Sequence, residues 1–266
     1  MTDGKLLVVT MYRVHARNAA AMWEALSKGS GALLVSTEEV RIVAPSPYHA
    51  LRAIVLDPHR NRKHTLDSIV DTVLGDSGLA RRVVEDPSGE LDLTGQRLRR
   101  RFTMTVMSRA PGPLLEPADR TGLRVVPVTD PGRLAVAERI LIAVFPPART
   151  TGDLRGRIQP VRVLGIPGWR VWLGYRDGVP AGAAYTFHDG TSLGLYQLGT
   201  LPEHRGHGVG RAVVTTILRA YPGETVTLTA TDGGRPLYDS LGFGSLSGAI
   251  WWSPDRSGDD SGRGLQ

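Results

Sequence analysis

Two Asp-Gly dipeptides in the second half of the chain separate three strand-like runs, and this pattern restricts the fold more than any other feature. The runs are WRVWLGY (169–175), VPAGAAYTF (179–187) and SLGLYQLGT (192–200). Asp177-Gly178 and Asp189-Gly190 lie between them. Such pairs favour the tight turns of antiparallel hairpins, because they accept the positive φ angles that these turns require. The sequence therefore predicts an antiparallel meander of three strands.

Helical patterns lie on both sides of this meander. Asp130 followed by Pro131 has the pattern of an N-cap with proline at the first helical position, and apolar residues then recur at helical spacing up to Phe145. After the meander come the glycine-rich stretch PEHRGHGVGR (202–211), a helical pattern, a strand-like run, a short helix and a last strand near residues 247–252. We therefore predict a mixed α/β (α+β) fold with a central, mostly antiparallel twisted sheet flanked by helices.

The first half of the chain shows a similar alternation of helical and strand-like patterns. Residues 56–74 align without gaps with residues 200–218, and the apolar positions of the two helical patterns coincide. A match this short arises by chance as readily as by internal duplication, so both origins remain open. If the halves are copies, Arg62, His64 and Leu66 stand where the second copy has glycine, and the first copy has lost the glycine-rich loop.

Composition divides the chain into four parts. Proline and small or polar residues dominate the stretch between the halves, without a helical or strand period, and a polar, glycine-rich stretch begins at Ser253. We therefore expect an accessory α/β domain at 1–110, a linker at 111–122, a second α/β domain at 123–252 and a disordered tail at 253–266.

Composition also excludes several classes of chemistry and location. The chain has no cysteine, so disulfides, thiolate nucleophiles and Cys-type zinc sites are excluded. It has no apolar run of about 18 residues and its start lacks a small-residue cleavage site. We expect a cytoplasmic protein without membrane contact, as a monomer or homodimer.

Arginine accounts for almost all of the positive charge. The formal net charge is +6, and three of the 32 basic residues are lysine, which leaves 29 arginines (32 − 3). Such a surface attracts nucleic acid or an acidic cofactor. A bias of the whole genome toward arginine explains this charge more simply, and we expect no nucleic-acid partner.

The stretch 202–211 has the properties of an anion-binding loop. The first backbone N–H groups of a helix lack intrahelical partners, and the helix dipole adds positive charge there, so a phosphate is favoured. Glycines at 206, 208 and 210 permit conformations that are closed to residues with a Cβ. The loop is not a P-loop, because no Gly-Lys-Ser/Thr is present, and it lacks the G-x-G-x-x-G spacing of a dinucleotide fingerprint.

Two motifs in order carry a resemblance to a known family. LPEHRGHGVGRAVV (201–214) resembles the acetyl-CoA-binding signature of the GNAT family of N-acetyltransferases, Arg/Gln-x-x-Gly-x-Gly/Ala, with Arg205, Gly208 and Gly210 at the signature positions. Further along, TDGGRPLYDSLGF (231–243) resembles the family's second motif, in which a helix carries Tyr and ends in Leu-Gly-Phe. The resemblance covers roughly residues 123–252. For the first half it is one of topology, that of a tandem GNAT protein with a degenerate N-terminal copy.

The resemblance implies acetyl-CoA as co-substrate, with its pyrophosphate on the loop amides and its pantetheine arm beside the third meander strand. The cofactor-binding residues that it implies are Leu198, Thr200, Leu201, Arg205, Gly206, His207, Gly208, Val209, Gly210 and Arg211. It assigns Tyr238 as the catalytic general acid that protonates the CoA thiolate. A backbone N–H near Leu201 would stabilise the oxyanion.

The general base is not assigned. Many family members place a glutamate on the third meander strand, whereas this chain has YQLGT at 196–200. A water relayed to His188, Asp189, Glu203 or Asp232, and an amine that arrives already neutral, both remain open.

Two further expectations complete the interpretation. His204 and His207 have no further ligand at metal-binding spacing, so we expect no metal site. The leading function is acetyl transfer from acetyl-CoA to a primary amine of a small molecule. The alternative is a regulatory module that binds acetyl-CoA without catalysis.

Overall fold

The computed structural model describes residues 3–75, 81–114, 121–146 and 153–255, and the chain divides into two compact units. Within the described residues, the first unit comprises 3–109 and 227–255, and the second comprises 110–226. No described helix is both long enough and apolar enough to cross a membrane.

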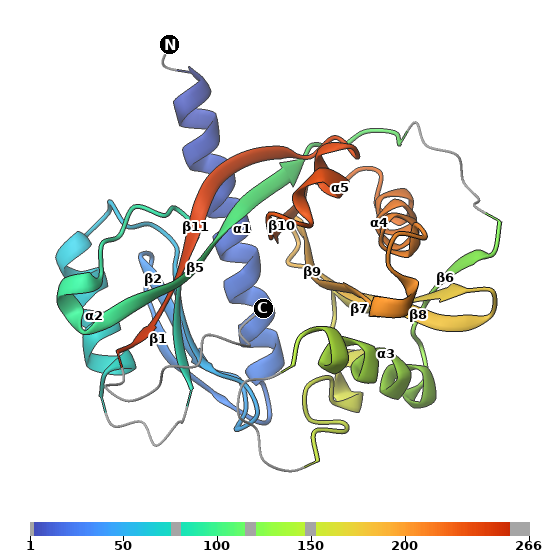
Figure 1. Ribbon diagram of the computed structural model, residues 1–266. Helices are drawn as coiled ribbons and strands as arrows, with labels where there is room; N and C mark the ends of the chain where they lie inside the picture. The colour runs from blue at the N-terminus through green and yellow to red at the C-terminus, as the bar shows by residue number, and fades with distance from the viewer. Residues whose placement is uncertain (1–2, 76–80, 115–120, 147–152, 256–266) are drawn as a thin grey trace. The chain divides into compact units, whose positions relative to one another are not determined.

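The first unit contains a sheet with a helix on each face (Figure 1). Its elements are α1 (Asp3–Ser27), β1 (Ala32–Ser36), β2 (Val40–Ala44), β3 (Leu51–Val55), α2 (Arg62–Val73), β4 (Arg82–Asp86), a 3-10 turn η1 (Thr94–Gln96), β5 (Leu98–Arg109), β10 (Val226–Ala230), α5 (Arg235–Asp239) and β11 (Gly244–Pro254). The strand order is β1-β2-β3-β4-β11-β5-β10. The pairings from β1 to β5 are antiparallel except that of β3 with β4, which are parallel and joined through α2.

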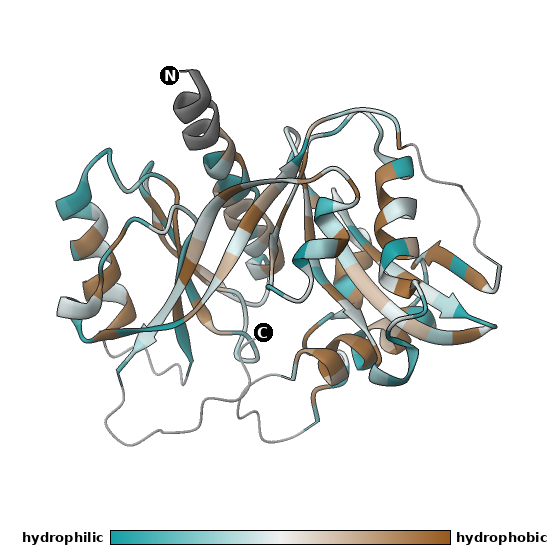
Figure 2. Cartoon of the chain, turned by 45° about the horizontal axis from the view of Figure 1, so that its top comes forward, coloured by the Kyte–Doolittle hydropathy of each residue, from teal (hydrophilic) through white to brown (hydrophobic). Residues whose placement is uncertain are grey.

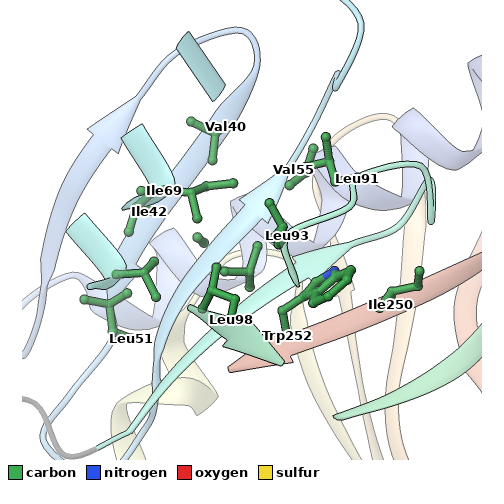
Figure 3. Close-up of a cluster of buried hydrophobic side chains, with 13 residues drawn as sticks. Val40, Ile42, Leu51, Val55, Ile69, Leu91, Leu93, Leu98, Ile250 and Trp252 are labelled. Carbon is green, nitrogen blue, oxygen red and sulfur yellow. The ribbon is translucent and has the colours of Figure 1, made fainter. Parts of the chain in front are cut away.

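Alternation along the strands decides which face of this sheet each side chain occupies. Leu51, Ala53 and Val55 of β3 belong to one buried apolar cluster with Ile69 and Val73 of α2 (Figure 3). Since successive residues of a strand point to opposite faces, the residues between them lie on the α1 side. The α2 side therefore holds one apolar core of the first unit.

The place of the last strand, β11, differs from what the sequence-predicted domain boundaries imply. β11 lies between β4 and β5 and pairs antiparallel with both, for example Ile250 with Asp86 and Trp251 with Phe102. Ile250 and Trp252 enter the core cluster of the first unit. The strand near residues 247–252, which the sequence assigns to a domain at 123–252, thus completes the first unit's sheet. Neither its apolar residues nor its length says which strands it pairs with.

The predicted linker and tail are described only in part. Residues 115–120 and 256–266 lie outside the described residues. The predicted disordered tail begins two residues too early, because Ser253 and Pro254 still pair with Arg99 and Leu98 at the end of β11.

The second unit contains the predicted meander. Its elements are β6 (Leu123–Pro127), α3 (Pro131–Val144), a 3-10 turn η2 (Val161–Gly165), β7 (Trp169–Arg176), β8 (Val179–His188), β9 (Leu193–Thr200), a 3-10 turn η3 (Pro202–His204) and α4 (Val209–Ala220). The order β9-β8-β7-β6 is antiparallel throughout. The predicted start of α3 is also confirmed, because the Asp130 side chain accepts a hydrogen bond from the Arg133 N–H at 2.9 Å and Pro131 follows it.

Glycines let the two helices of this unit approach the sheet from opposite faces. A Cβ at Gly182 would lie 2.8 Å from Cγ1 of Val209 on α4, whereas one at Gly199 would lie 3.1 Å from Cβ of Val144 on α3. Figure 2 shows apolar and polar residues alternating around α4, and its buried residues include Val213 and Ile217. This close packing fixes the position of the N-terminus of α4, which a short loop joins to the end of β9.

Candidate functional site

The loop from β9 to α4 presents a series of backbone donors. Gly206 and Gly208 have φ values of 76° and 81°, in the left-handed region that favours glycine. Gly208 is the N-cap of α4 and no side chain caps the helix. In the described part of the chain, no acceptor is recorded for the N–H groups of residues 206–210. The open amides and the helix dipole together favour an anion here.

Basic side chains surround these amides. Arg205 is exposed, and its Nε donates to the carbonyl of Thr200 at 3.2 Å, which holds the guanidinium at the start of the loop. His207 Nδ1 lies 2.7 Å from the carbonyl oxygen of Arg205. Arg211 lies in the first turn of α4. The residues present therefore fit a pyrophosphate, which accepts hydrogen bonds from amides and guanidinium groups alike.

The end of β9 is irregular next to this loop. Gln197 has a φ of 47°, and the ladder with β8 pairs Tyr196 and Gly199 but leaves Gln197 and Leu198 unpaired. This two-for-one mismatch is a β-bulge, which re-aims the backbone and leaves a residue outside the ladder.

The structure corrects the sequence-based choice of oxyanion donor. The Leu201 N–H already donates to the carbonyl of Ala181 at 2.9 Å. It therefore has no hydrogen to spare for a substrate. Gln197 and Leu198, in the bulge, have no register partner on β8.

Tyr238 lies on α5 and is packed. Its side chain is 7% exposed, and its ring meets that of Phe243 edge to face with centroids 5.6 Å apart. Burial raises the pKa of the phenol above its ordinary value, so the hydroxyl is protonated at neutral pH but is a weaker acid than that of an exposed tyrosine. Tyr238 belongs to the first unit and the glycine-rich loop to the second. A common site containing both remains a prediction.

The residues considered for a relayed base have structural roles. His188 Nδ1 accepts from the Gly190 N–H, and its Nε2 lies 3.0 Å from Oε2 of Glu224. Asp189 Oδ1 accepts from the N–H groups of Thr191 and Ser192, each at 2.8 Å. These contacts build the β8–β9 turn.

Two other acidic residues of the sequence analysis lie at the surface. Glu203 is exposed in η3, and Asp232 is exposed before α5. The residue whose side chain bonds the backbone at the start of α5 is Thr231, whose Oγ1 accepts from the Gly234 N–H at 3.2 Å. Across the described ranges, no three His, Cys, Asp or Glu side chains gather as metal ligands.

Sequence reasoning missed a buried carboxylate in the second unit. Glu138 on α3 is 2% exposed and accepts three backbone N–H bonds, from Gly156 at 2.6 Å, Ile158 at 2.9 Å and Gln159 at 2.7 Å. The available signal was its position beside Ala137 and Leu141 on the apolar face of the helix, where a charge must be compensated. Glu138 thus fixes the segment that leads from α3 to β7.

The N-terminus of α2 in the first unit corresponds to the open N-terminus of α4, but it is capped by a side chain. β3, α2 and β4 form a parallel crossover, and the N-cap of α2 is Asn61, whose Oδ1 accepts from the His64 N–H at 3.1 Å. Asp57 just before it pairs with Arg13 at 2.9 Å. A side chain of the protein therefore caps the N-terminus of α2, whereas the N-terminus of α4 has no side-chain cap.

Comparisons with known proteins agree with this geometry. Residues 167–244 match the family model described as an acetyltransferase (GNAT) domain. No curated protein sequence matches the chain. A GCN5-related N-acetyltransferase from Kribbella flavida is similar in structure, with a TM-score of 0.65 and 20% identity over 91% of this chain and 96% of that one.

Two more solved structures are similar over most of the chain. A GCN5-related N-acetyltransferase from Sphaerobacter thermophilus has a TM-score of 0.54 and 17% identity, and covers 96% of both chains. A tandem GNAT protein from the clavulanic acid biosynthesis pathway has a TM-score of 0.51 and 16% identity, over 83% of this chain and 79% of that one. Residues 167–244 therefore match the GNAT acetyltransferase family model, within a chain that has the GNAT fold over most of its length.

Proposed function

We propose that the protein is an N-acetyltransferase that moves an acetyl group from acetyl-CoA to a primary amine of a small molecule. The observation that carries this proposal is the uncapped N-terminus of α4, with positive φ at Gly206 and Gly208 and basic residues beside it. The GNAT match over residues 167–244 supports the acyl-transfer chemistry.

The residues of the chain divide the work as follows. The amides of residues 206–210 and the side chains of Arg205 and Arg211 bind the pyrophosphate. The backbone beside Leu198, left unpaired by β8, binds the pantetheine arm as an added strand would, and its amide is the proposed oxyanion donor in place of Leu201. Acetyl-CoA supplies the thioester.

In the transfer step, the neutral amine nitrogen forms a bond to the acetyl carbon while the carbon–sulfur bond breaks. Tyr238 donates its proton to the departing sulfur, and the amine gives up its own proton to water. The segment 196–200 of β9 contains no carboxylate, so no side chain of that stretch serves as the base.

We infer that the N-terminal half, residues 1–110, is a degenerate copy that does not bind the cofactor. The β3–α2–β4 crossover and the self-capped helix with Asn61 support this inference.

Calorimetric titration with acetyl-CoA tests the binding site. Gly208→Glu places a carboxylate among the open amides and adds strain at a positive φ, so we expect at least about a tenfold loss of affinity. Gly190→Glu is the matched control, because Gly190 also has a positive φ (98°) with no atom within 4 Å of an added Cβ, but lies in the β8–β9 turn. Equal affinity for both variants would refute the loop assignment.

Thiol release over a panel of primary amines tests the chemistry. Tyr238→Phe keeps the packed ring and removes the acid, so turnover should fall by about 10²-fold or more at unchanged acetyl-CoA affinity. The absence of a carboxylate on β9 favours the second candidate, a module that binds acetyl-CoA without turnover. Binding without thiol release across the panel would select that candidate.

A further inference from the structure

Two arginines and one carboxylate share the α1 side of the first unit's sheet. Leu51 and Val84 point into the core on the α2 side, so Arg52, Arg81 and Glu85 point to the other face by strand alternation. The Leu51 N–H donates to the Arg81 carbonyl at 3.0 Å, which extends the β3–β4 ladder to Arg81. Arg52 and Arg81 lie at the N-terminal ends of two parallel strands, and Glu85 lies further along the second of them.

Arg52 is held firmly within this cluster. Its Nη1 makes a short ion pair with Oε1 of Glu85, and its guanidinium carbon lies 4.0 Å from the centre of the Trp23 ring. Trp23 in turn meets the His49 ring edge to face, with centroids 5.6 Å apart. Aromatic rings thus line one side of a guanidinium whose charge is already paired.

Arg81 has no such partner. Its Nε and Nη1 are buried, and in the described part of the chain neither donates a hydrogen bond. Neighbouring Arg82, by contrast, donates from Nη1 to the Val73 carbonyl at 3.1 Å. Burial, and then the positive charge of Arg52, lower the pKa of the Arg81 guanidinium below its ordinary value. Both effects disfavour the charged form of Arg81.

The charges of the cluster leave a positive excess. Arg52 and Arg81 contribute two positive charges and Glu85 one negative charge, which Arg52 already uses. A buried charge without a partner is costly, and an anion beside Arg81 would remove that cost. Within the described residues, Nη2 of Arg81 makes no hydrogen bond and is not fully buried, so it is the guanidinium nitrogen that is open to solvent.

We propose that Arg81, with Arg52 beside it and Trp23 and His49 as the wall, binds a small anion through carboxylate or phosphate oxygens. A planar guanidinium matches both kinds of oxyanion with paired hydrogen bonds. This site lies in the first unit and does not depend on the proposed acetyl transfer.

Calorimetric titration of the full chain at constant ionic strength tests the proposal, with inorganic phosphate in one arm and succinate in the other. The parent for this test is Gly208→Glu, because the α4 loop would otherwise bind phosphate too. We expect saturable binding of one anion in at least one arm, and that arm identifies the ligand class. Arg81→Gln should weaken binding by at least about tenfold, whereas Arg82→Gln, on the other face, should leave it unchanged.

Two results would overturn the proposal: no saturable binding of either anion to the parent, or equal binding by the Arg81→Gln variant. If Arg81→Gln does not fold, the Nε–H resonance of Arg81 in the Gly208→Glu parent provides the same decision. It should shift along a saturable curve as the bound anion is added, and a resonance that stays constant would refute the site.

Discussion

Replacing Glu138 should release the segment between α3 and β7. The Glu138 carboxylate accepts hydrogen bonds from the N–H groups of Gly156, Ile158 and Gln159 at 2.6–2.9 Å while being 2% exposed. A hydrogen bond to a charged group contributes about 1.5–3 kcal/mol, and breaking one side of a buried charged contact costs about 3–5 kcal/mol. Because the freed N–H groups can move to water, we expect about 3 kcal/mol for Glu138→Ala.

Trypsin provides a local assay for this loss. Arg155 and Arg157 flank the anchored backbone and are exposed, so cleavage there requires the segment to open. Under conditions where opening is fast relative to cleavage, the rate follows the open population. A loss of about 3 kcal/mol therefore predicts cleavage that is about a hundredfold faster.

Glu138→Gln separates charge from shape. It retains one oxygen acceptor and places an NH₂ group opposite a backbone donor, so its cleavage rate should lie between those of the parent and Glu138→Ala. Arg139→Gln, on the exposed side of the same helix, is the matched control and should resemble the parent. If Glu138→Ala is cleaved as slowly as Arg139→Gln, the carboxylate does not anchor the segment and the reasoning is refuted.

The remaining predictions concern the first unit. His15 is buried, and burial lowers its pKa from 6.5 to about 4. The unfolded chain therefore binds more protons than the folded one between these values, and stability should fall by about 3 kcal/mol as the pH drops through this window. Urea unfolding at pH 7 and pH 4.5 should show this slope in the parent and a smaller slope in His15→Gln; equal slopes would contradict it. A chain that ends at Arg109 lacks β11, which lies between β4 and β5, so it should show no cooperative unfolding by circular dichroism, whereas a chain that ends at Asp255 should. Asn61→Ala removes the side-chain cap of α2 and should cost about 1 kcal/mol; an unchanged unfolding midpoint would show that the cap contributes nothing.

The glycine-rich loop is the part of the candidate site whose geometry depends most on the local sequence. Its role depends on the φ angles of Gly206 and Gly208 and on the start of α4, which are local properties. The oxyanion donor was predicted less well, because the Leu201 N–H is taken by Ala181 on the neighbouring strand. Which amide a strand leaves free depends on its partner's register, and the bulge at Gln197 sets that register.

By itself, the sequence determined the elements whose chemistry is local. The Asp-Gly turns, the Asp130 cap and the open start of α4 all depend on residues a few positions apart. Only the tertiary structure decided that β11 completes the sheet of the first unit and that Glu138 anchors a segment about twenty positions further along the chain. It also decided that Arg81 and Arg52 point to the same face of the first unit's sheet, where Nε and Nη1 of Arg81 have no acceptor among the described residues. An alternating pattern tells which face of a strand is apolar. Backbone hydrogen bonds, however, are the same for every residue type. The partner of a strand or of a buried charge is therefore settled only when the chain packs.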